Sequence, residues 1–266
     1  ITRNTSIGPA TPGCSTDGSD ETTLDVEWSS AMAPGASIKT FEGVDNCDAA
    51  LNSAISAAVN DQTVSVISLS WGACEAYSDP SFISEVDTLL AGASAMGKSI
   101  FVASGDDGAF DCGDSTISVD YPASSPYVTS VGGTSLSLST SPVAWSTETA
   151  WSCSNVSSCT GSSGGGGGGC SAVEQPVGSW QQGVSACGGF RAVPDVAANA
   201  DPGTGYTIIW NGSQNSFWGG TSFAAPVWAG IMADINQGRV GRNLPVEGFA
   251  NTDLYSAGHA SSQPYH

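Results

Sequence analysis

Segments with the length and apolar content of β-strands alternate with helix-like segments between residues 36 and 131. This alternation predicts a parallel sheet, because parallel neighbours need a crossover connection that is usually a helix. Helices then cover both faces of the sheet, so the strands can be apolar throughout. The expected fold class is therefore α/β. The expected strands are residues 36–41, 64–70, 99–103 and 127–131, the expected helices are 47–59 and 80–96, and a hairpin is expected at 206–218.

The composition restricts the function classes. The chain has 266 residues, of which 40% are hydrophobic, so we expect a single domain over residues 1–266. It carries 25 acidic residues but only 6 Lys and Arg, and this excess opposes binding to nucleic acid or anionic membranes. Few basic groups also limit the charge that builds up at low pH, which suits an acidic environment. Residues 1–19 and the Gly-, Ser- and Cys-rich stretch 153–170 are predicted to be loops.

Eight cysteines and two histidines are present, without the paired CxxC spacing of zinc sites. We therefore expect disulfides, an extracellular or other oxidising compartment, and no metal site. Cys74 and Cys112 each follow the end of a predicted strand, so they should meet if those strands are neighbours. No apolar run approaches the roughly 20 residues of a membrane span.

A serine in the sequence Gly-Gly-Thr-Ser-Phe-Ala-Ala-Pro, residues 219–226, precedes an apolar helical run. Glycines permit a sharp turn, and a helix N-terminus offers unpaired N–H groups with partial positive charge. Ser222 is therefore a candidate nucleophile, although an ordinary helix cap would have the same appearance.

Two acidic residues share one face of another predicted helix. Glu21 and Asp25 are four residues apart, near the helix N-terminus, where acids are usually solvated. The predicted strands 64–70 and 99–103 end near Trp71 and Asp106 respectively. Ligands of parallel sheets bind beyond the carboxyl ends of the strands, so these positions are candidate site residues.

Together these motifs resemble the sedolisins, or serine-carboxyl peptidases. The resemblance rests on motifs that occur in the family's order across residues 20–258. They are Glu21-x-x-x-Asp25, Ala33-Pro34-Gly35-Ala36, Ser68-Leu69-Ser70-Trp71-Gly72, Ser104-Gly105-Asp106-x-Gly108, the glycine run before Cys170-Ser171, Pro194-Asp195-Val196 and Gly220-Thr221-Ser222-x-x-x-Pro226. The resemblance implies a subtilisin-like three-layer fold and proteolysis at acidic pH. It implies that Ser222 is the nucleophile, Glu21 its general base, Asp25 the partner of Glu21, and Asp106 a member of the oxyanion hole.

The chemistry of these residues agrees with that assignment. No His precedes Ser222, and at pH 4 a His is almost wholly protonated, whereas a Glu of ordinary pKa is about one-third ionised. A carboxylate at position 106 would repel a developing oxyanion, but a carboxylic acid donates a hydrogen bond to it. Asp106 should therefore hold its proton more tightly than the Glu21–Asp25 pair.

The expected substrate-binding residues flank this centre: Ser70, Trp71, Gly72, Gly168, Gly169 and Ser171. Trp71 fits two interpretations equally, a member of the hydrogen-bond network behind the acids or a core aromatic. The glycine run is either a flexible loop or bare backbone that a substrate peptide approaches closely.

The resemblance also implies partners beyond the substrate. These are the enzyme's own N-terminal propeptide, removed from a zymogen, and Ca²⁺, whose ligands are expected beyond His266. The chain is expected to be incomplete at both ends and to act as a monomer. Endopeptidase and tripeptidyl-peptidase activity both remain open. The alternative function is a catalytically silent relative that binds extended peptides.

Overall fold

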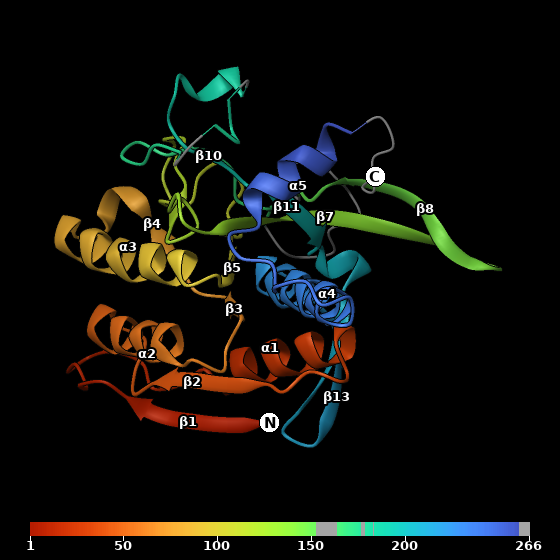
Figure 1. Cartoon of the computed structure of the whole chain (residues 1–266), viewed down its shortest axis with the longest axis horizontal. Coiled ribbons are helices and arrows are strands. Elements are labelled where there is room, and N and C mark those ends of the chain that lie inside the picture. Colours follow the sequence, from red (N-terminus) through yellow and green to blue (C-terminus); the bar gives the residue numbers. More distant parts are fainter. Residues whose placement is uncertain (153–163, 177–178, 183, 261–266) are drawn as a thin grey trace.

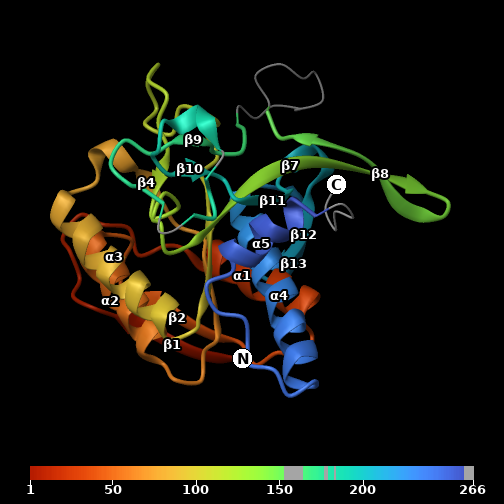
Figure 2. The ribbon, with the colours of Figure 1, turned by 45° about the horizontal axis from the view of Figure 1, so that its top comes forward.

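The computed structural model describes residues 1–152, 164–176, 179–182 and 184–260. Its central sheet has the strand order β11–β7–β5–β3, with all three of these pairings parallel (Figure 1). The strands are β3 (Val66–Leu69), β5 (Ser99–Ala103), β7 (Thr129–Thr140) and β11 (Val196–Asn199). A fifth strand, β8 (Val143–Ala150), pairs antiparallel with β7 and forms a long hairpin that projects from the body of the molecule (Figure 2).

Two helical layers cover the central sheet, as Figure 2 shows. Strand β5 demonstrates the arrangement because its successive side chains point to opposite faces. Ile100 and Val102 pack with helices α2 (Asp48–Asn60) and α3 (Pro80–Ala95). Phe101 and Ala103 pack with helix α4 (Thr221–Val240). The predicted α/β class and the three-layer, mostly parallel architecture are confirmed.

The remaining helices and strands surround this core. Helix α1 (Ser19–Met32) packs against α4, and the hairpin of β12 (Tyr206–Trp210) and β13 (Ser213–Trp218) packs against α1 through β12. Helix α5 (Asn251–Gly258) contributes Leu254 to the α4 side of the core. The short strands are β4 (Ala73–Cys74), β6 (Asp120–Tyr121), β9 (Gly169–Cys170) and β10 (Ala192–Val193), and the single 3-10 turns are Glu75–Tyr77, Ser185–Cys187 and Pro202–Thr204.

Two sequence predictions are wrong near the N-terminus. The stretch 1–19 is not all loop, because Thr2–Ile7 forms strand β1, which pairs in parallel with β2 (Lys39–Gly43). Strand β2, expected in the central sheet, instead pairs with β1 in a separate two-stranded sheet. The polar sequence of β1 concealed it, since most of its residues are exposed and carry no apolar alternation.

Three disulfides connect described residues: Cys14–Cys47, Cys74–Cys112 and Cys170–Cys187. The predicted pairing of Cys74 with Cys112 is confirmed, and the strands that precede them, β3 and β5, are neighbours as required. Cys153 and Cys159, with most of the predicted 153–170 loop, lie outside the described residues. No helix in the described part of the chain has both the length and the apolar character needed to cross a membrane.

Candidate active site

The candidate nucleophile Ser222 lies in the first turn of α4 and is partly exposed. The turn before it depends on Gly220, whose φ of 116° lies in the region that side chains rarely adopt. A Cβ on Gly220 would also lie 2.7 Å from Oδ2 of Asp106. Glycine at this position therefore brings Ser222 and Asp106 close together.

Helix α1 brings both predicted acids to Ser222. The Ser222 side chain hydrogen-bonds the Glu21 carboxyl group, and the charge of Glu21 acts on Asp25 one helical turn away. Ser70, at the end of β3, links the helices, since its Oγ lies 2.6 Å from Oδ1 of Asp25 and 3.1 Å from the carbonyl oxygen of Ser222. A serine, two acids and a bridging serine from three separate elements thus form one connected group.

Burial raises the pKa values of both acids. The pKa of Glu21 rises to about 7, mainly because its carboxylate is desolvated, while the hydrogen bond from Ser222 opposes the rise and the charge of Asp106 adds to it. The pKa of Asp25 lies well above its ordinary value, first through burial and then through the nearby Glu21, while Ser70 opposes the rise. Two carboxyl groups this close in a poorly solvated site favour sharing a proton.

Asp106 lies in the turn after β5 and is held by the residue next to the nucleophile. The Thr221 backbone N–H and its Oγ1 hydroxyl lie 2.7 and 2.9 Å from Oδ1 of Asp106. Burial raises the pKa of Asp106, and both Thr221 bonds oppose the rise because they stabilise the anion. Oδ1 is thus engaged as an acceptor, which leaves Oδ2 to carry the proton.

The pKa values of Asp106 and Glu21 are both raised, so the expected order of their proton affinities stays a prediction. Burial is the main cause of both rises, and hydrogen bonds oppose both, from Ser222 at Glu21 and from Thr221 at Asp106. A carbonyl oxygen placed beside Oδ2 would accept a hydrogen bond only from protonated Asp106 and would therefore raise its pKa further. Loss of the Asp106 charge also removes one cause of the raised pKa of Glu21.

The glycine run supports the turn that carries Asp106. Gly165 N–H donates to the carbonyl of Asp106 at 2.8 Å, and Gly167 N–H donates to the carbonyl of Gly105 at 2.7 Å. A Cβ on Gly167 would lie 2.1 Å from the backbone oxygen of Ser104. The glycines here allow two backbone segments of the protein itself to approach each other closely.

The predicted substrate-binding residues have different environments. Gly72 follows Ser70 at the carboxyl end of β3, whereas Gly168 packs against Pro194 and Gly169 pairs in the short β9–β10 ladder. Ser171 is buried, and its Oγ donates to Oε1 of Glu75 at 2.6 Å. Because that hydroxyl is occupied inside the protein, Ser171 is not placed to meet a substrate.

Trp71 has features both of a core aromatic and of a residue beside the two acids. Its ring packs at 6.2 Å, edge to face, on Phe82 of the α3 core, and it lines the same cavity as Glu21 and Asp25.

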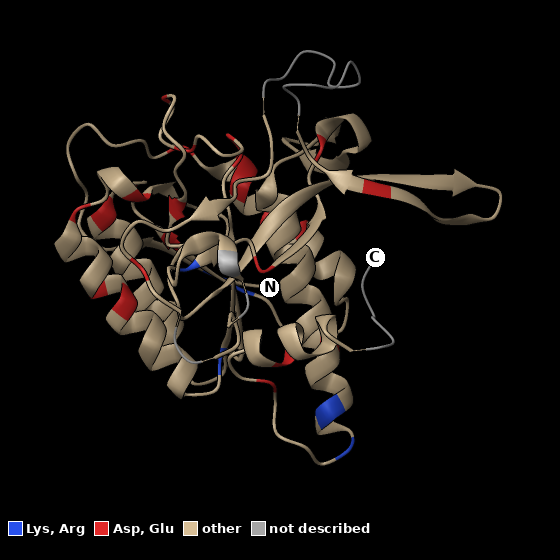
Figure 3. Ribbon diagram, turned by 90° about the horizontal axis from the view of Figure 1, so that it is seen from above, with Lys and Arg blue, Asp and Glu red and all other residues tan. Residues whose placement is uncertain are grey.

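Two acids beside Asp106 were not predicted. Burial, aided by neighbouring carboxylates, raises the pKa of Asp111 to about 7 and that of Asp120 to about 8. Both converge on Gly105, where a Cβ would lie 2.6 Å from Asp111 Oδ1 and 2.9 Å from Asp120 Oδ2. The sequence feature that could have pointed to them is the absence of Lys and Arg between residues 98 and 191, which leaves Asp111 and Asp120 without a cation nearby in the sequence. Figure 3 shows the general scarcity of basic residues.

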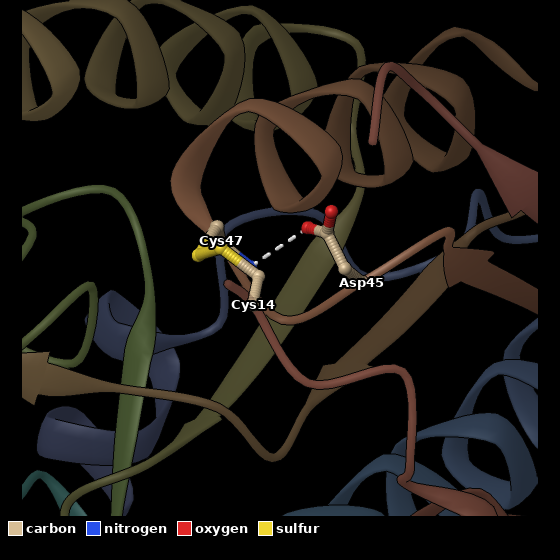
Figure 4. Close-up of side chains that lie close together, drawn as sticks. All are labelled: Cys14, Asp45 and Cys47. Atoms are coloured by element: carbon tan, nitrogen blue, oxygen red, sulfur yellow. Dashed lines mark hydrogen bonds between the residues drawn. A yellow bond between two sulfur atoms is a disulfide. The ribbon is translucent and has the colours of Figure 1, made fainter. Parts of the chain in front are cut away.

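Cys14, Asp45 and Cys47 lie close enough together to suggest metal ligands (Figure 4). However, the two cysteines form a disulfide, which leaves no thiolate for a metal. Asp45 accepts hydrogen bonds from the N–H groups of Cys47 and Thr11, at 3.0 and 2.6 Å. This cluster therefore stabilises a loop and does not form a metal centre.

Comparison with known proteins identifies the family. The Peptidase_S8 profile, which describes the subtilase family, matches residues 14–247, so the chain belongs to the subtilases. A solved structure of Pseudomonas sedolisin, a serine-carboxyl proteinase complexed with two molecules of pseudo-iodotyrostatin, superposes with a TM-score of 0.82 and 33% identity over 97% of this chain and 72% of the chain in that structure. Within the subtilases, the chain is a member of the sedolisin family.

Two curated relatives agree with this placement. Kumamolisin from Bacillus sp. (strain MN-32) is 39% identical over 247 residues, which cover 88% of this chain and 42% of kumamolisin. Tripeptidyl-peptidase 1 from Bos taurus is 32% identical over 261 residues, again 88% of this chain and 42% of the relative. The chain thus spans less than half the length of these curated relatives.

Proposed function

We propose that this chain is the catalytic part of a secreted, acid-acting serine-carboxyl endopeptidase. The observation that carries the proposal is the connection of Ser222 to Glu21, of Glu21 to Asp25, and of Thr221 to Asp106 around one helix N-terminus. Raised carboxyl pKa values and disulfides support an acidic, oxidising compartment.

In the proposed reaction, ionised Glu21 removes the hydroxyl proton of Ser222 while Oγ attacks the scissile carbonyl carbon. Asp25, kept protonated by its environment, holds Glu21 in position and limits the charge at the site. Protonated Asp106 donates a hydrogen bond from Oδ2 to the oxyanion, an interaction typically worth about 3–4 kcal/mol in the transition state. Glu21 then returns the proton to the leaving amine, and water releases the acyl group by the same steps in reverse.

Substrate contacts are proposed at Ser70, Trp71 and Gly72 beside the nucleophile, with Gly168 and Gly169 on the opposite segment. We further propose a monomeric domain over residues 1–266, an N-terminal propeptide partner, and Ca²⁺ bound by ligands beyond His266.

Digestion of a protein substrate from pH 2 to 8 tests the proposal, with the variants Ser222→Ala, Glu21→Ala and Asp25→Ala as controls. Each variant should lose most of its turnover, and because the residues act as a unit the triple variant should be little worse than Ser222→Ala. Full activity in Glu21→Ala refutes the general-base role. Labelling by a peptide aldehyde distinguishes an active enzyme from a silent peptide-binding relative. Product lengths from mass spectrometry distinguish internal cleavage from release of tripeptides.

A further inference from the structure

Two carboxyl groups outside the Ser222 site form a hydrogen bond with each other. Asp87 lies on helix α3, and Glu174 follows strand β9. Burial is the main cause of the raised pKa of both groups, and the bond between them raises the pKa of Glu174 and lowers that of Asp87. Glu174 is therefore the donor and Asp87 the acceptor. Because an ionised carboxyl group can only accept, this bond exists only while the pair keeps at least one proton.

Two buried hydroxyl groups hold the acceptor in place. Oγ of Ser125 and the phenolic oxygen of Tyr121 lie 2.7 and 3.0 Å from Oδ1 of Asp87. Both residues are wholly buried, so they cannot follow a moving side chain. Asp87 thus offers Glu174 a fixed partner on the body of the protein.

The donor belongs to residues 169–174, which we call the β9 segment. A second carboxyl group also holds this segment, because the Ser171 hydroxyl and the Ala172 N–H donate to Glu75 at 2.6 and 2.7 Å. The Glu174 N–H in turn donates to Oγ of Ser171 at 2.7 Å. Two carboxyl groups of the body, from α3 and from the turn that follows β4, therefore hold the β9 segment.

The charges around this contact are of one sign. The charge of Glu75 raises the pKa values of both Asp87 and Glu174. The Arg191 N–H donates to the carbonyl of Glu174 at 2.9 Å, but its guanidinium group pairs with Asp195. None of the salt bridges between described residues involves the three carboxyl groups. Ionisation of the pair therefore adds repulsion that no salt bridge of the described residues offsets.

The β9 segment continues directly from the glycine run that supports Asp106. Gly165 and Gly167 hydrogen-bond the turn that carries Asp106, and Gly168 N–H donates to the carbonyl of Gly108 at 3.2 Å. Gly168 alone separates Gly167 from the first residue of strand β9. A displacement of the β9 segment is therefore transmitted to the Asp106 turn over a very short length of chain.

We propose that Asp87 and Glu174 are positioning residues for Asp106, because their shared proton holds the β9 segment against helix α3. The proposal rests on the proposed function, in which Asp106 donates to the oxyanion. Burial, with the charges of Asp87 and Glu75, raises the pKa of Glu174 from 4.5 to about 7. The stabilising contact is therefore fully present below about pH 4.5 and is lost as the pH rises through 7. The β9 segment is held in acid and released near neutral pH.

Amide hydrogen exchange from pH 4 to 8 tests this without peptidase activity. The Ser222→Ala background prevents self-digestion, and exchange is expressed as protection relative to an unstructured chain, which removes the intrinsic effect of pH. Protection of residues 171–174 should fall about tenfold or more between pH 5 and pH 8. The amides of Gly165 and Gly167 should lose protection in parallel, whereas strand β5 should remain protected.

Three substitutions separate the shared proton from simple packing. Glu174→Gln provides a donor to Asp87 that cannot ionise, so the β9 segment should stay protected at pH 8. Glu174→Leu removes the donor and should lower protection about tenfold already at pH 4. Glu85→Gln changes an exposed carboxyl group of helix α3 and should behave like the parent at every pH.

Equal loss of protection in the parent and in Glu174→Gln at pH 8 overturns the proposal. So does a β9 segment that loosens while Gly165 and Gly167 remain protected, because the positioning role would then be absent. In the active chain, Glu174→Leu should lower kcat at pH 4 about tenfold with little change in KM, and Glu174→Gln should restore it. A parent chain that hydrolyses no peptide refutes the proposed function, and the exchange results still decide whether Asp87 and Glu174 hold the β9 segment.

Discussion

Replacing Glu21 by glutamine should separate the proposed catalytic role of this residue from its effect on stability. Folding raises the pKa of Glu21 from 4.5 to about 7, because the native site desolvates the carboxylate. The native state therefore binds this proton more tightly than the unfolded chain does. The stabilising effect is fully present below about pH 4.5 and is lost as the pH rises through 7.

The magnitude follows from the same pKa change. A rise from 4.5 to about 7 corresponds to about 3 kcal/mol of native-state stability lost between acidic pH and pH 8. Glutamine has nearly the same shape and does not titrate. Glu21→Gln should therefore match the wild type at pH 4, exceed it by up to about 3 kcal/mol at pH 8, and be nearly inactive at every pH.

Urea unfolding at pH 4, 6 and 8 measures this difference. Asp17→Asn is a suitable control, because it removes the same charge from an exposed position. The control should change stability by less than about 0.5 kcal/mol at each pH. Parallel stability profiles for Glu21→Gln and the wild type up to pH 8 would contradict the claim that burial raises the pKa of Glu21.

Three further substitutions test the supports of the site. Gly220→Ala forces a side chain into φ 116° and against Asp106, so kcat should fall about 100-fold, measured by peptide hydrolysis. Gly167→Ala places a Cβ 2.1 Å from the backbone oxygen of Ser104, so the free energy of unfolding, measured with urea, should fall by about 3 kcal/mol. The control Gly35→Ala adds a Cβ where no atom lies within 4 Å and should leave the free energy of unfolding nearly unchanged. Asp106→Asn removes a charge that raises the pKa of Glu21 in the free enzyme, so the acidic limb of the kcat/KM profile should move to lower pH; an unmoved limb refutes that coupling.

The sequence predicted the layers well because their signals are local. Apolar runs and helix-forming segments alternate along the chain, and the strand 99–103 was placed at its observed bounds. Position within a sheet is a tertiary property, which explains why β2 was assigned to the central sheet although it pairs with β1. The polar strand β1 is stabilised by its backbone ladder with β2 and by contacts such as Arg3 with Glu42, separated by 39 residues.

Interactions within the candidate site were less predictable than its residues. Ser70 was expected to contact substrate, but its Oγ also bridges Asp25 and the backbone of Ser222, 152 residues away. The glycine run suggested a substrate-binding backbone, yet Gly165 and Gly167 hydrogen-bond the turn that carries Asp106. No local pattern reports which backbone a glycine will approach, so such roles need the folded chain.

The pKa of about 7 at Glu21 also changes the reason why glutamate could replace histidine as the base in the proposed mechanism. At pH 4 a carboxyl with that pKa is only about 0.1% ionised, so ordinary glutamate acidity no longer gives it an advantage over histidine. What differs is the resting charge: protonated glutamic acid is neutral, whereas protonated histidine would be a cation in a desolvated site. Under the proposed mechanism, substrate binding would keep Asp106 protonated and so lower the pKa of Glu21, because the Asp106 charge is one cause of its rise. In the proposed mechanism, Glu21 is therefore easier to ionise in the same complex in which Asp106 is protonated, and this coupling would favour activity at acidic pH.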